Sequence, residues 1–415
     1  MWAAPLEALM DKREKDREIL RELAKRYAEI AALPTQDEKR RLWRALNGLR
    51  PERPMVAIDQ ACWEQADAGG GPALRCEDDE CRRYEAWLRR TLLQWELFPA
   101  DMVVEPVVRV ERAIYNVGLA VGGAAVDGMD AEAATPGISH DEAETRRRMD
   151  FAEWLFNGVG LELRLEGVDP RISIWDPIAA WLGAEGAPGA PAGEPSAPAS
   201  EPGAPAGAPG MAHALAARLA AGYMSMLDQL ESLGLLCHSQ PLIGCSGAYA
   251  EELPAPGFDP NRPRTKDLWM HWPARPPSAA SPALPVESEA SHMMPIFERF
   301  GLVHCSCPSP ADGGLELIRR IPHLRKASFG PSADPARCAH GIGRDFVYSC
   351  NPDAALVAAG TFDEDAARAE LLRAKEACAR HGCPLEFIMK GDGAARAKPE
   401  LLKKWADAAM SVACS

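Results

Sequence analysis

The chain contains 415 residues, 47% of them hydrophobic, and its 46 Lys and Arg against 60 Asp and Glu give a formal net charge of -14. The length allows one large α/β core or two ordinary domains, and the negative charge disfavours binding to nucleic acid or to an anionic membrane surface. The N-terminus lacks the apolar core of a signal peptide, and no stretch approaches the roughly 20 apolar residues that span a bilayer. We therefore expect a cytoplasmic protein with no nucleic-acid partner and no membrane partner.

The first 50 residues predict an N-terminal helical extension. Apolar side chains recur at three- and four-residue steps between residues 6 and 32, as in an amphipathic helix; they are Leu6, Leu9, Leu20, Leu23, Tyr27 and Ile30. The first strand candidate, MVAID (55–59), is followed by a helical pattern at 81–98. This succession is typical of a βα unit.

Strand-like apolar runs recur along the rest of the chain and are separated by helical patterns at 212–232, 363–382 and 399–412. Repeated strand, crossover helix and parallel strand favour an α/β fold with a mainly parallel sheet. Eight such strands predict a (β/α)8 TIM barrel over residues 51–415. The strand candidates are 55–59, 102–108, 161–165, 233–238, 301–305, 325–329, 346–350 and 384–389.

Two segments interrupt this pattern. Residues 183–210 contain only Gly, Ala, Pro, Ser and Glu, so they offer little to pack and predict a disordered Pro/Ala/Gly-rich insertion. Residues 273–285, PARPPSAASPALP, predict a second flexible or extended segment that could form part of a loop over a pocket.

The stretch GLVHCSCPSP (301–310) suggests a metal site. His304 and Cys307 stand at the predicted carboxyl end of a barrel strand, where active sites of parallel barrels lie. Imidazole and thiolate together suit zinc, and a catalytic zinc needs three protein ligands with one position open. Groups that could complete the site follow later strands; they are Cys350, Cys383, Glu386 and Asp392. The alternative is that these are buried thiols and solvated acids, since most of the 12 cysteines should be small hydrophobic residues.

Other stretches admit two interpretations. CEDDEC (76–81) resembles a ligand pair, but acids before a helix are favoured by the helix dipole, so we favour capping. His140 in GISHDEAE is either a substrate-facing loop histidine or a solvated one. Trp63 and Glu64 follow the first strand and either hold a cationic or aromatic substrate or pack on the rim. The glycine-rich segment 118–128 lacks GxGxxG spacing, so nucleotide binding has little support.

Several stretches together resemble the uroporphyrinogen decarboxylase-like (β/α)8 family, in particular its branch of corrinoid-dependent methyltransferases. The resemblance covers most of the chain outside the proline-rich insertion. It rests on LWRALNGLRPERPMVAIDQACWE (42–64), CRRYEAWLRRTLLQWELFPADMVVEP (81–106), GCSGAYAEELP (244–254), FERFGLVHCSCPSPADGGLELIRRIPHLRKASFGPSAD (297–334) and GRDFVYSCNPDAAL (343–356).

The resemblance implies a zinc-assisted methyltransferase that moves a methyl group between a small methylated compound and a corrinoid carried by a separate protein. It implies zinc on His304 and Cys307, with Glu386 as the expected third ligand. Around the substrate it places Trp63, Glu64, His140 and Tyr249.

This chain also departs from the family's patterns. In the family a His-x-Cys pair binds zinc, whereas Ser306 stands at that cysteine position and the thiol is displaced to Cys307. The late zinc cysteine falls near GDG, where Asp392 and the earlier Glu386 offer ligands. DQACWEQ replaces the arginine-rich loop of the true decarboxylases, which disfavours porphyrinogen decarboxylation. The alternatives are a cofactor-independent decarboxylase-type lyase and a non-catalytic small-molecule-binding member of the same fold.

Overall fold

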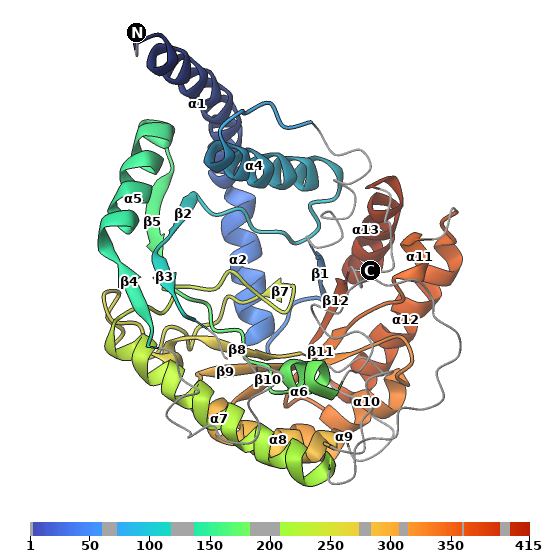
Figure 1. Cartoon of the computed structure of the whole chain (residues 1–415). Coiled ribbons are helices and arrows are strands. Elements are labelled where there is room, and N and C mark those ends of the chain that lie inside the picture. Colours follow the sequence, from blue (N-terminus) through green and yellow to red (C-terminus); the bar gives the residue numbers. More distant parts are fainter. Residues whose placement is uncertain are drawn as a thin grey trace, which may run out of the picture.

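The structure is a computed structural model that describes residues 3–59, 73–117, 137–182, 208–273, 284–306, 314–358, 361–390 and 399–415. Its centre is a curled sheet of six parallel strands in the order β1-β12-β11-β10-β9-β8 (Figure 1). The strands are β1 (Met55–Ile58), β8 (Trp269–Trp272), β9 (Leu302–Ser306), β10 (Leu324–Phe329), β11 (Val347–Cys350) and β12 (Leu385–Met389).

Helices cover the outer, convex face of this sheet (Figure 1). Every second strand residue, such as Val303, Phe329 and Phe387, packs into one large core with these helices, because side chains alternate between the two faces of a strand. The covering helices are α6 (Trp175–Leu182), α7 (Ala208–Ser232), α8 (Val286–Phe297), α9 (Gly314–Arg320), α10 (Pro335–Ile342), α11 (Ala355–Ala358), α12 (Glu364–His381) and α13 (Pro399–Cys414).

The inner, concave face is covered by α2 (Pro34–Asn47) and by a short antiparallel hairpin, β6 (Leu242–Ile243) and β7 (Ser246–Gly247). Trp43 of α2 is buried there and packs directly on the backbone at Gly247. The Asn47 amide donates to the carbonyls of Gly247 and Tyr249, which ties the end of α2 to the hairpin. A short 3-10 turn, η2 (Thr265–Asp267), precedes β8.

A second group of elements, the N-terminal lobe, has its own core. Leu20 and Leu23 of α1 (Ala3–Ala31) pack with residues of α4, α5 and β2. The parallel pair β2·β5 and the antiparallel pair β3·β4 complete this lobe. Its other elements are α4 (Asp79–Leu97), α5 (Glu142–Phe156), β2 (Val107–Glu111), β3 (Ala113–Tyr115), β4 (Ser139–Asp141) and β5 (Glu162–Glu166).

The predicted α/β class with a parallel sheet is confirmed. The six parallel strands curl into a half-barrel. The predicted strands at 55–59, 301–305, 325–329, 346–350 and 384–389 all lie in the one parallel sheet. The expected closed barrel of eight strands is not formed among the described residues, since β2 and β5 pair only with each other.

Two strand predictions differ in detail, and one strand of the sheet was not predicted. Residues 102–108 contribute only the start of β2 at Val107, and residues 233–238 make a single parallel bridge between Leu236 and Val168. The sixth strand of the sheet, β8, was not predicted: it has four residues, and three of them are buried, so it shows no clean alternation of apolar and polar side chains.

The predicted insertion lies outside the described residues over 183–207, and its last three residues begin α7. Most of the segment 273–285 and the glycine-rich segment 118–128 also lie outside them. Within the described part of the chain, no helix is both long enough and apolar enough to cross a membrane. The cysteines there are all free thiols.

Candidate functional site

Polar side chains line the concave face of the sheet in two neighbouring rows. Strand register aligns His271, His304 and Lys326 across β8, β9 and β10. The next row toward the carboxyl ends of the strands aligns Ser306, Ser328, Ser349 and Glu386 across β9 to β12. Barrel interiors are usually filled by branched apolar residues, and buried polar groups cost free energy unless they are hydrogen-bonded. These two rows therefore form the strongest candidate site in the described structure.

His304 lies at the centre of this cluster and is fully buried. Its Nδ1 lies 3.1 Å from the Ile243 carbonyl oxygen, which can only accept, so Nδ1 carries the proton. Its Nε2 lies 2.7 Å from Ser328 Oγ and accepts the hydroxyl hydrogen. Burial holds the pKa of His304 well below its usual value, and the charges of Lys390 and Lys326 act in the same direction. His304 is therefore a neutral imidazole with its lone pair on Nε2.

A second histidine, His271, stands beside it on β8. The two rings are 5.2 Å apart between centroids, and His271 Nε2 lies 3.2 Å from Ser306 Oγ. Burial lowers the pKa of His271 to about 3, with further lowering by Lys390 and Arg171. The hairpin turn passes directly over both rings, since a Cβ at Gly244 would lie 2.8 Å from His271 Nε2 and from His304 Nδ1.

Next to the histidines lies a buried ion pair. Lys326 Nζ is 2.8 Å from Glu386 Oε2, and both side chains have no exposed surface. Ser246 Oγ donates to the same carboxylate oxygen at 2.7 Å, and the ammonium also donates to Ser246 Oγ and to the Gly247 carbonyl. Burial lowers the pKa of Lys326, whereas Glu386 raises it. This pair therefore holds the hairpin against the inner, concave face of the sheet.

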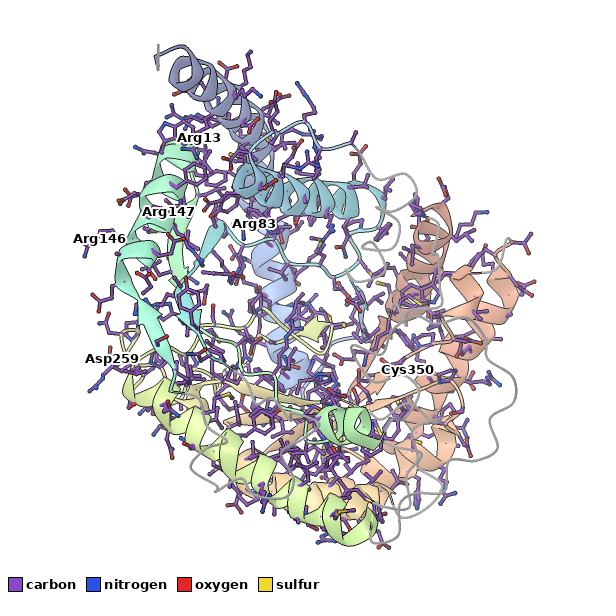
Figure 2. The ribbon with its side chains drawn as sticks, in the orientation of Figure 1. Arg13, Arg83, Arg146, Arg147, Asp259 and Cys350 are labelled. Atoms are coloured by element: carbon purple, nitrogen blue, oxygen red, sulfur yellow. The ribbon has the colours of Figure 1, made fainter. Side chains whose placement is uncertain are left out.

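The three candidate thiols that the structure describes all lie on the outer, convex side of the sheet. Cys305 belongs to the core on the convex face, opposite His304, as strand alternation requires. Cys350 belongs to the same outer core, at the end of β11 (Figure 2), and Cys383 Sγ donates to the Ala339 carbonyl there. Neither of these two thiols can therefore meet His304. Cys307 and Asp392 lie outside the described residues.

Of the four predicted substrate residues, the structure describes His140 and Tyr249. His140 lies on β4 in the N-terminal lobe, where its Nε2 is 2.9 Å from Thr145 Oγ1. The Tyr249 hydroxyl donates to Glu105 Oε1 at 3.0 Å. Trp63 and Glu64 lie outside the described residues.

The CEDDEC segment caps a helix, as we favoured. Asp78 is the N-cap of α4 and accepts from the backbone N–H of Glu80 and Cys81. Asp16 of α1 accepts from the N–H groups of Glu77 and Asp78, so α1 is tied to the same turn. Cys76 and Cys81 are buried, and burial raises the pKa of the Cys81 thiol to about 12.

Five members of the cluster were not singled out from the sequence: His271, Lys326, Ser328, Ser349 and Ser246. A polar residue inside an apolar strand run is the signal that could have found two of them, because Lys326 and Ser328 interrupt the strand at 325–329. Ser246 carried no such signal, since it contacts Glu386 across 140 residues of sequence.

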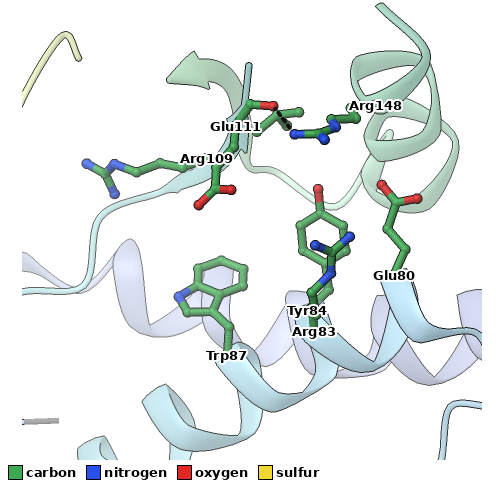
Figure 3. A pocket seen from close by; sticks show the side chains of 8 residues that line it. Glu80, Arg83, Tyr84, Trp87, Arg109, Glu111 and Arg148 are labelled. Atoms are coloured by element: carbon green, nitrogen blue, oxygen red, sulfur yellow. Dashed lines mark hydrogen bonds between the residues drawn. The ribbon is translucent and has the colours of Figure 1, made fainter. Parts of the chain in front are cut away.

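The structure also contains a surface pocket of about 350 Å³ in the N-terminal lobe, between α4, α5 and β2 (Figure 3). Its charged groups are largely neutralised in pairs: Arg109 meets Glu105, and Arg148 meets Glu144. Arg147 also pairs with Glu80, one of the lining residues. None of the residues that the sequence predicted for the site lines it. The lining residues are Glu80, Arg83, Tyr84, Trp87, Arg109, Val110, Glu111 and Arg148.

Comparison with known proteins adds no assignment: no protein-family model matches the chain, and no curated protein matches it significantly. Among the described residues, no group of three or more His, Cys, Asp or Glu is placed to hold a metal ion. The functional inference therefore depends on the geometry of the concave face and on the resemblance seen in the sequence.

Proposed function

We propose that this protein is a methyltransferase that moves a methyl group between a small methylated compound and a corrinoid carried by a separate protein, with zinc held by His304 and Cys307. The observation that carries the proposal is the state of His304. It is neutral, it faces the concave side of the sheet, and its lone pair is on Nε2.

These properties are those required of a zinc-binding histidine. A metal-ligating imidazole binds through one nitrogen and commonly donates its other N–H to a carbonyl or carboxylate, which fixes its tautomer and orientation. Ile243 supplies that carbonyl here. Only the Ser328 hydroxyl, which is free to rotate, occupies the Nε2 lone pair. His304 therefore fits the first ligand position without any change of protonation.

Glu386, the expected third ligand, is less well suited to bind zinc. Its Oε2 already accepts from Lys326 and from Ser246, and withdrawing it would leave a buried ammonium unpaired. We therefore limit the proposed ligands to His304 and Cys307, and assign Glu386 to the ion pair that supports the hairpin.

When bound, zinc would act as a Lewis acid on the donor heteroatom of the methylated compound. The chain's own residues orient the imidazole and exclude water: Ile243 holds the His304 ring and the hairpin covers it from one side. The row of Ser306, Ser328, Ser349 and Glu386 lies next to it, toward the carboxyl ends of the strands. Ligands of parallel α/β sheets bind at those ends, so this is the side on which the methylated compound is expected.

Metal analysis of purified protein is the first test. The wild type from zinc-supplemented cells, purified without chelator, should contain stoichiometric zinc, whereas His304→Ala and Cys307→Ala should lose it. Cys305→Ala is the matched control, because its thiol faces the opposite side of the sheet, and it should keep zinc. Ser328→Ala should also keep zinc, since it removes only the hydroxyl that occupies Nε2.

Turnover is the second test. The zinc-loaded wild type should convert cob(I)alamin to methylcobalamin in the presence of a methylated amine, ether or thioether from a panel, followed by absorbance under anaerobic conditions. Cys307→Ala should abolish this reaction. Metal-free wild type would overturn the proposal and favour a non-catalytic small-molecule-binding protein.

A further inference from the structure

The surface pocket of the N-terminal lobe, with a volume of about 350 Å³, is formed mainly by one face of a helix and one face of a strand (Figure 3). Glu80, Arg83 and Trp87 follow one another at steps of three and four residues on α4, so they share one face of the helix. Arg109 and Glu111 are two residues apart on β2, so they share one face of the strand. Cavities of this size hold small ligands, and the proposed function makes no use of this one.

Two aromatic rings give the pocket a preformed apolar surface. The Trp87 ring packs against Tyr27 with ring centroids 4.9 Å apart, and the Tyr84 ring meets Phe156 edge-on at 5.2 Å. Tyr27 and Phe156 are buried in the core of the lobe, and neither lines the pocket. The core therefore holds both rings in place, and they present their free sides to a ligand.

The charges of the lining leave one cation and one anion without a partner. Three of the five charged side chains have ion-pair partners; they are Glu80, Arg109 and Arg148. The other two are Arg83 on α4 and Glu111 on β2. Among the described residues, neither side chain forms an ion pair or a hydrogen bond, and the two are not paired with each other across the pocket. A ligand between them can therefore pair with both.

The Tyr84 hydroxyl adds a hydrogen-bond donor to the same pocket. Figure 3 shows Arg83, Tyr84 and Trp87 rising from α4, with Glu111 directed toward them from β2. Burial raises the pKa of Tyr84 to about 12, so the hydroxyl stays protonated at neutral pH. In the described part of the chain this hydroxyl has no hydrogen-bond partner. It is therefore free to donate to an anionic group that pairs with Arg83.

These groups together define the chemistry of the ligand. A carboxylate suits Arg83, because the guanidinium offers two parallel N–H donors to its two oxygens. An ammonium suits Glu111, since a carboxylate beside aromatic rings favours a cation. A flat apolar group suits the Trp87 ring. A ligand with only one of the two charges would leave Arg83 or Glu111 unpaired.

We propose that the pocket between α4 and β2 binds a free α-amino acid with an aromatic side chain. Its carboxylate pairs with Arg83 and accepts from the Tyr84 hydroxyl, its ammonium pairs with Glu111, and its side chain packs on Trp87. This second site goes beyond the proposed methyltransferase and shares no residue with it.

The test compares three compounds with the same aromatic ring on the full-length protein, with binding followed by isothermal titration calorimetry. Phenylalanine carries both charges, phenethylamine carries only the ammonium, and 3-phenylpropionate carries only the carboxylate. Phenylalanine should bind at least about tenfold more tightly than either of the others, which is the effect of one charge-assisted hydrogen bond.

Variants assign each charge to its partner. Arg83→Met should weaken phenylalanine binding by about tenfold and leave phenethylamine binding unchanged. Glu111→Gln should weaken phenylalanine binding by a similar factor and leave 3-phenylpropionate binding unchanged. The matched controls are Arg146→Met and Glu96→Gln, which change exposed residues of α5 and α4 outside the lining, and both should bind phenylalanine as the wild type does.

Three results would overturn the proposal. They are no detectable binding of phenylalanine, equal binding of all three compounds, and phenylalanine binding that Arg83→Met and Glu111→Gln change no more than the controls do. Arg83 and Glu111 are exposed, so both variants should fold, which circular dichroism verifies. His304 takes no part in this pocket, so the outcome is independent of the zinc test.

Discussion

The ammonium of Lys326 lies 2.8 Å from Glu386 Oε2, and neither side chain exposes any surface to solvent. The rings of Trp43 and Trp269 flank the same ammonium, with centroids at 5.1 and 5.8 Å. Desolvating two charges is costly, and it is offset only when the pair is close and its remaining hydrogen-bonding capacity is used. Ser246 and Gly247 of the hairpin make hydrogen bonds to the carboxylate and to the ammonium. The pair therefore joins the sheet to the hairpin that covers its inner face.

Breaking this pair should be strongly destabilising. Lys326→Met leaves the Glu386 carboxylate buried and unpaired, and we expect a loss of about 3–5 kcal/mol in the free energy of unfolding. Urea denaturation followed by circular dichroism measures it. The double variant Lys326→Met/Glu386→Leu should recover most of the loss, because no uncompensated charge remains. A single variant as stable as the parent would contradict this account of the pair.

Stability of the metal-free protein should fall in mild acid. The pKa of His271 is lowered to about 3 by burial, Lys390 and Arg171, whereas an unfolded histidine titrates near 6.5. Below about pH 6.5 the unfolded state therefore binds a proton at this histidine that the folded state does not bind. The free energy of unfolding falls progressively as the pH decreases from about 6.5 toward 3. His304 acts in the same direction.

Urea midpoints measured between pH 7 and pH 5 test this expectation. The wild type should lose stability over that interval, and His271→Gln should lose less, because one of the two histidines that resist protonation is gone. If the urea midpoint changed equally with pH in the wild type and in His271→Gln, the His271 side chain would have the same pKa in the folded and unfolded states.

The contact between α2 and the hairpin predicts the effect of one added methyl group. A Cβ at Gly247 would lie 2.4 Å from the Trp43 ring, so Gly247→Ala must push a buried tryptophan or the hairpin aside. We expect a loss of about 1–3 kcal/mol, as in other overpacked cores, and a lower melting temperature. Gly330→Ala serves as the control, because a Cβ there meets nothing within 4 Å.

Removing the N-cap of α4 should reduce stability by a smaller amount. Asp78 accepts from the N–H groups of Glu80 and Cys81, and Asp78→Ala should cost about 1 kcal/mol of stability through those unsatisfied donors. Asp79→Ala, at the next position, removes a charge of the same sign from an exposed residue that does not cap, and it should cost less. Chemical denaturation of both variants distinguishes capping from a general charge effect.

Much of the fold could be predicted from the sequence, because short apolar runs and helical periods are local properties. Five strands of the central sheet and the helices at 81–98, 212–232, 363–382 and 399–412 were found in this way. Strand β8 was not, since Trp269 belongs to a short segment whose burial depends on what packs over it.

For the candidate site, the sequence pointed to His304. It predicted Glu386 as a zinc ligand, whereas Glu386 pairs with Lys326 in the structure. Alternation along β9 is a local rule, so the opposite directions of His304 and Cys305 followed from the sequence. The pairing of Glu386 with Lys326 did not, because a carboxylate near a strand end gives no indication of which distant residue will face it.

By itself, the sequence determined the α/β class, the position of most strands and the face on which each strand residue lies, since these depend on spacing along one segment. The tertiary structure alone decided that Ser246, Lys326 and Glu386 meet on one ion pair and that a hairpin covers two histidines. These contacts join segments 60 to 140 residues apart. They arise from the curl of the sheet and from the requirement that buried charges find partners, neither of which is encoded in any local stretch of residues.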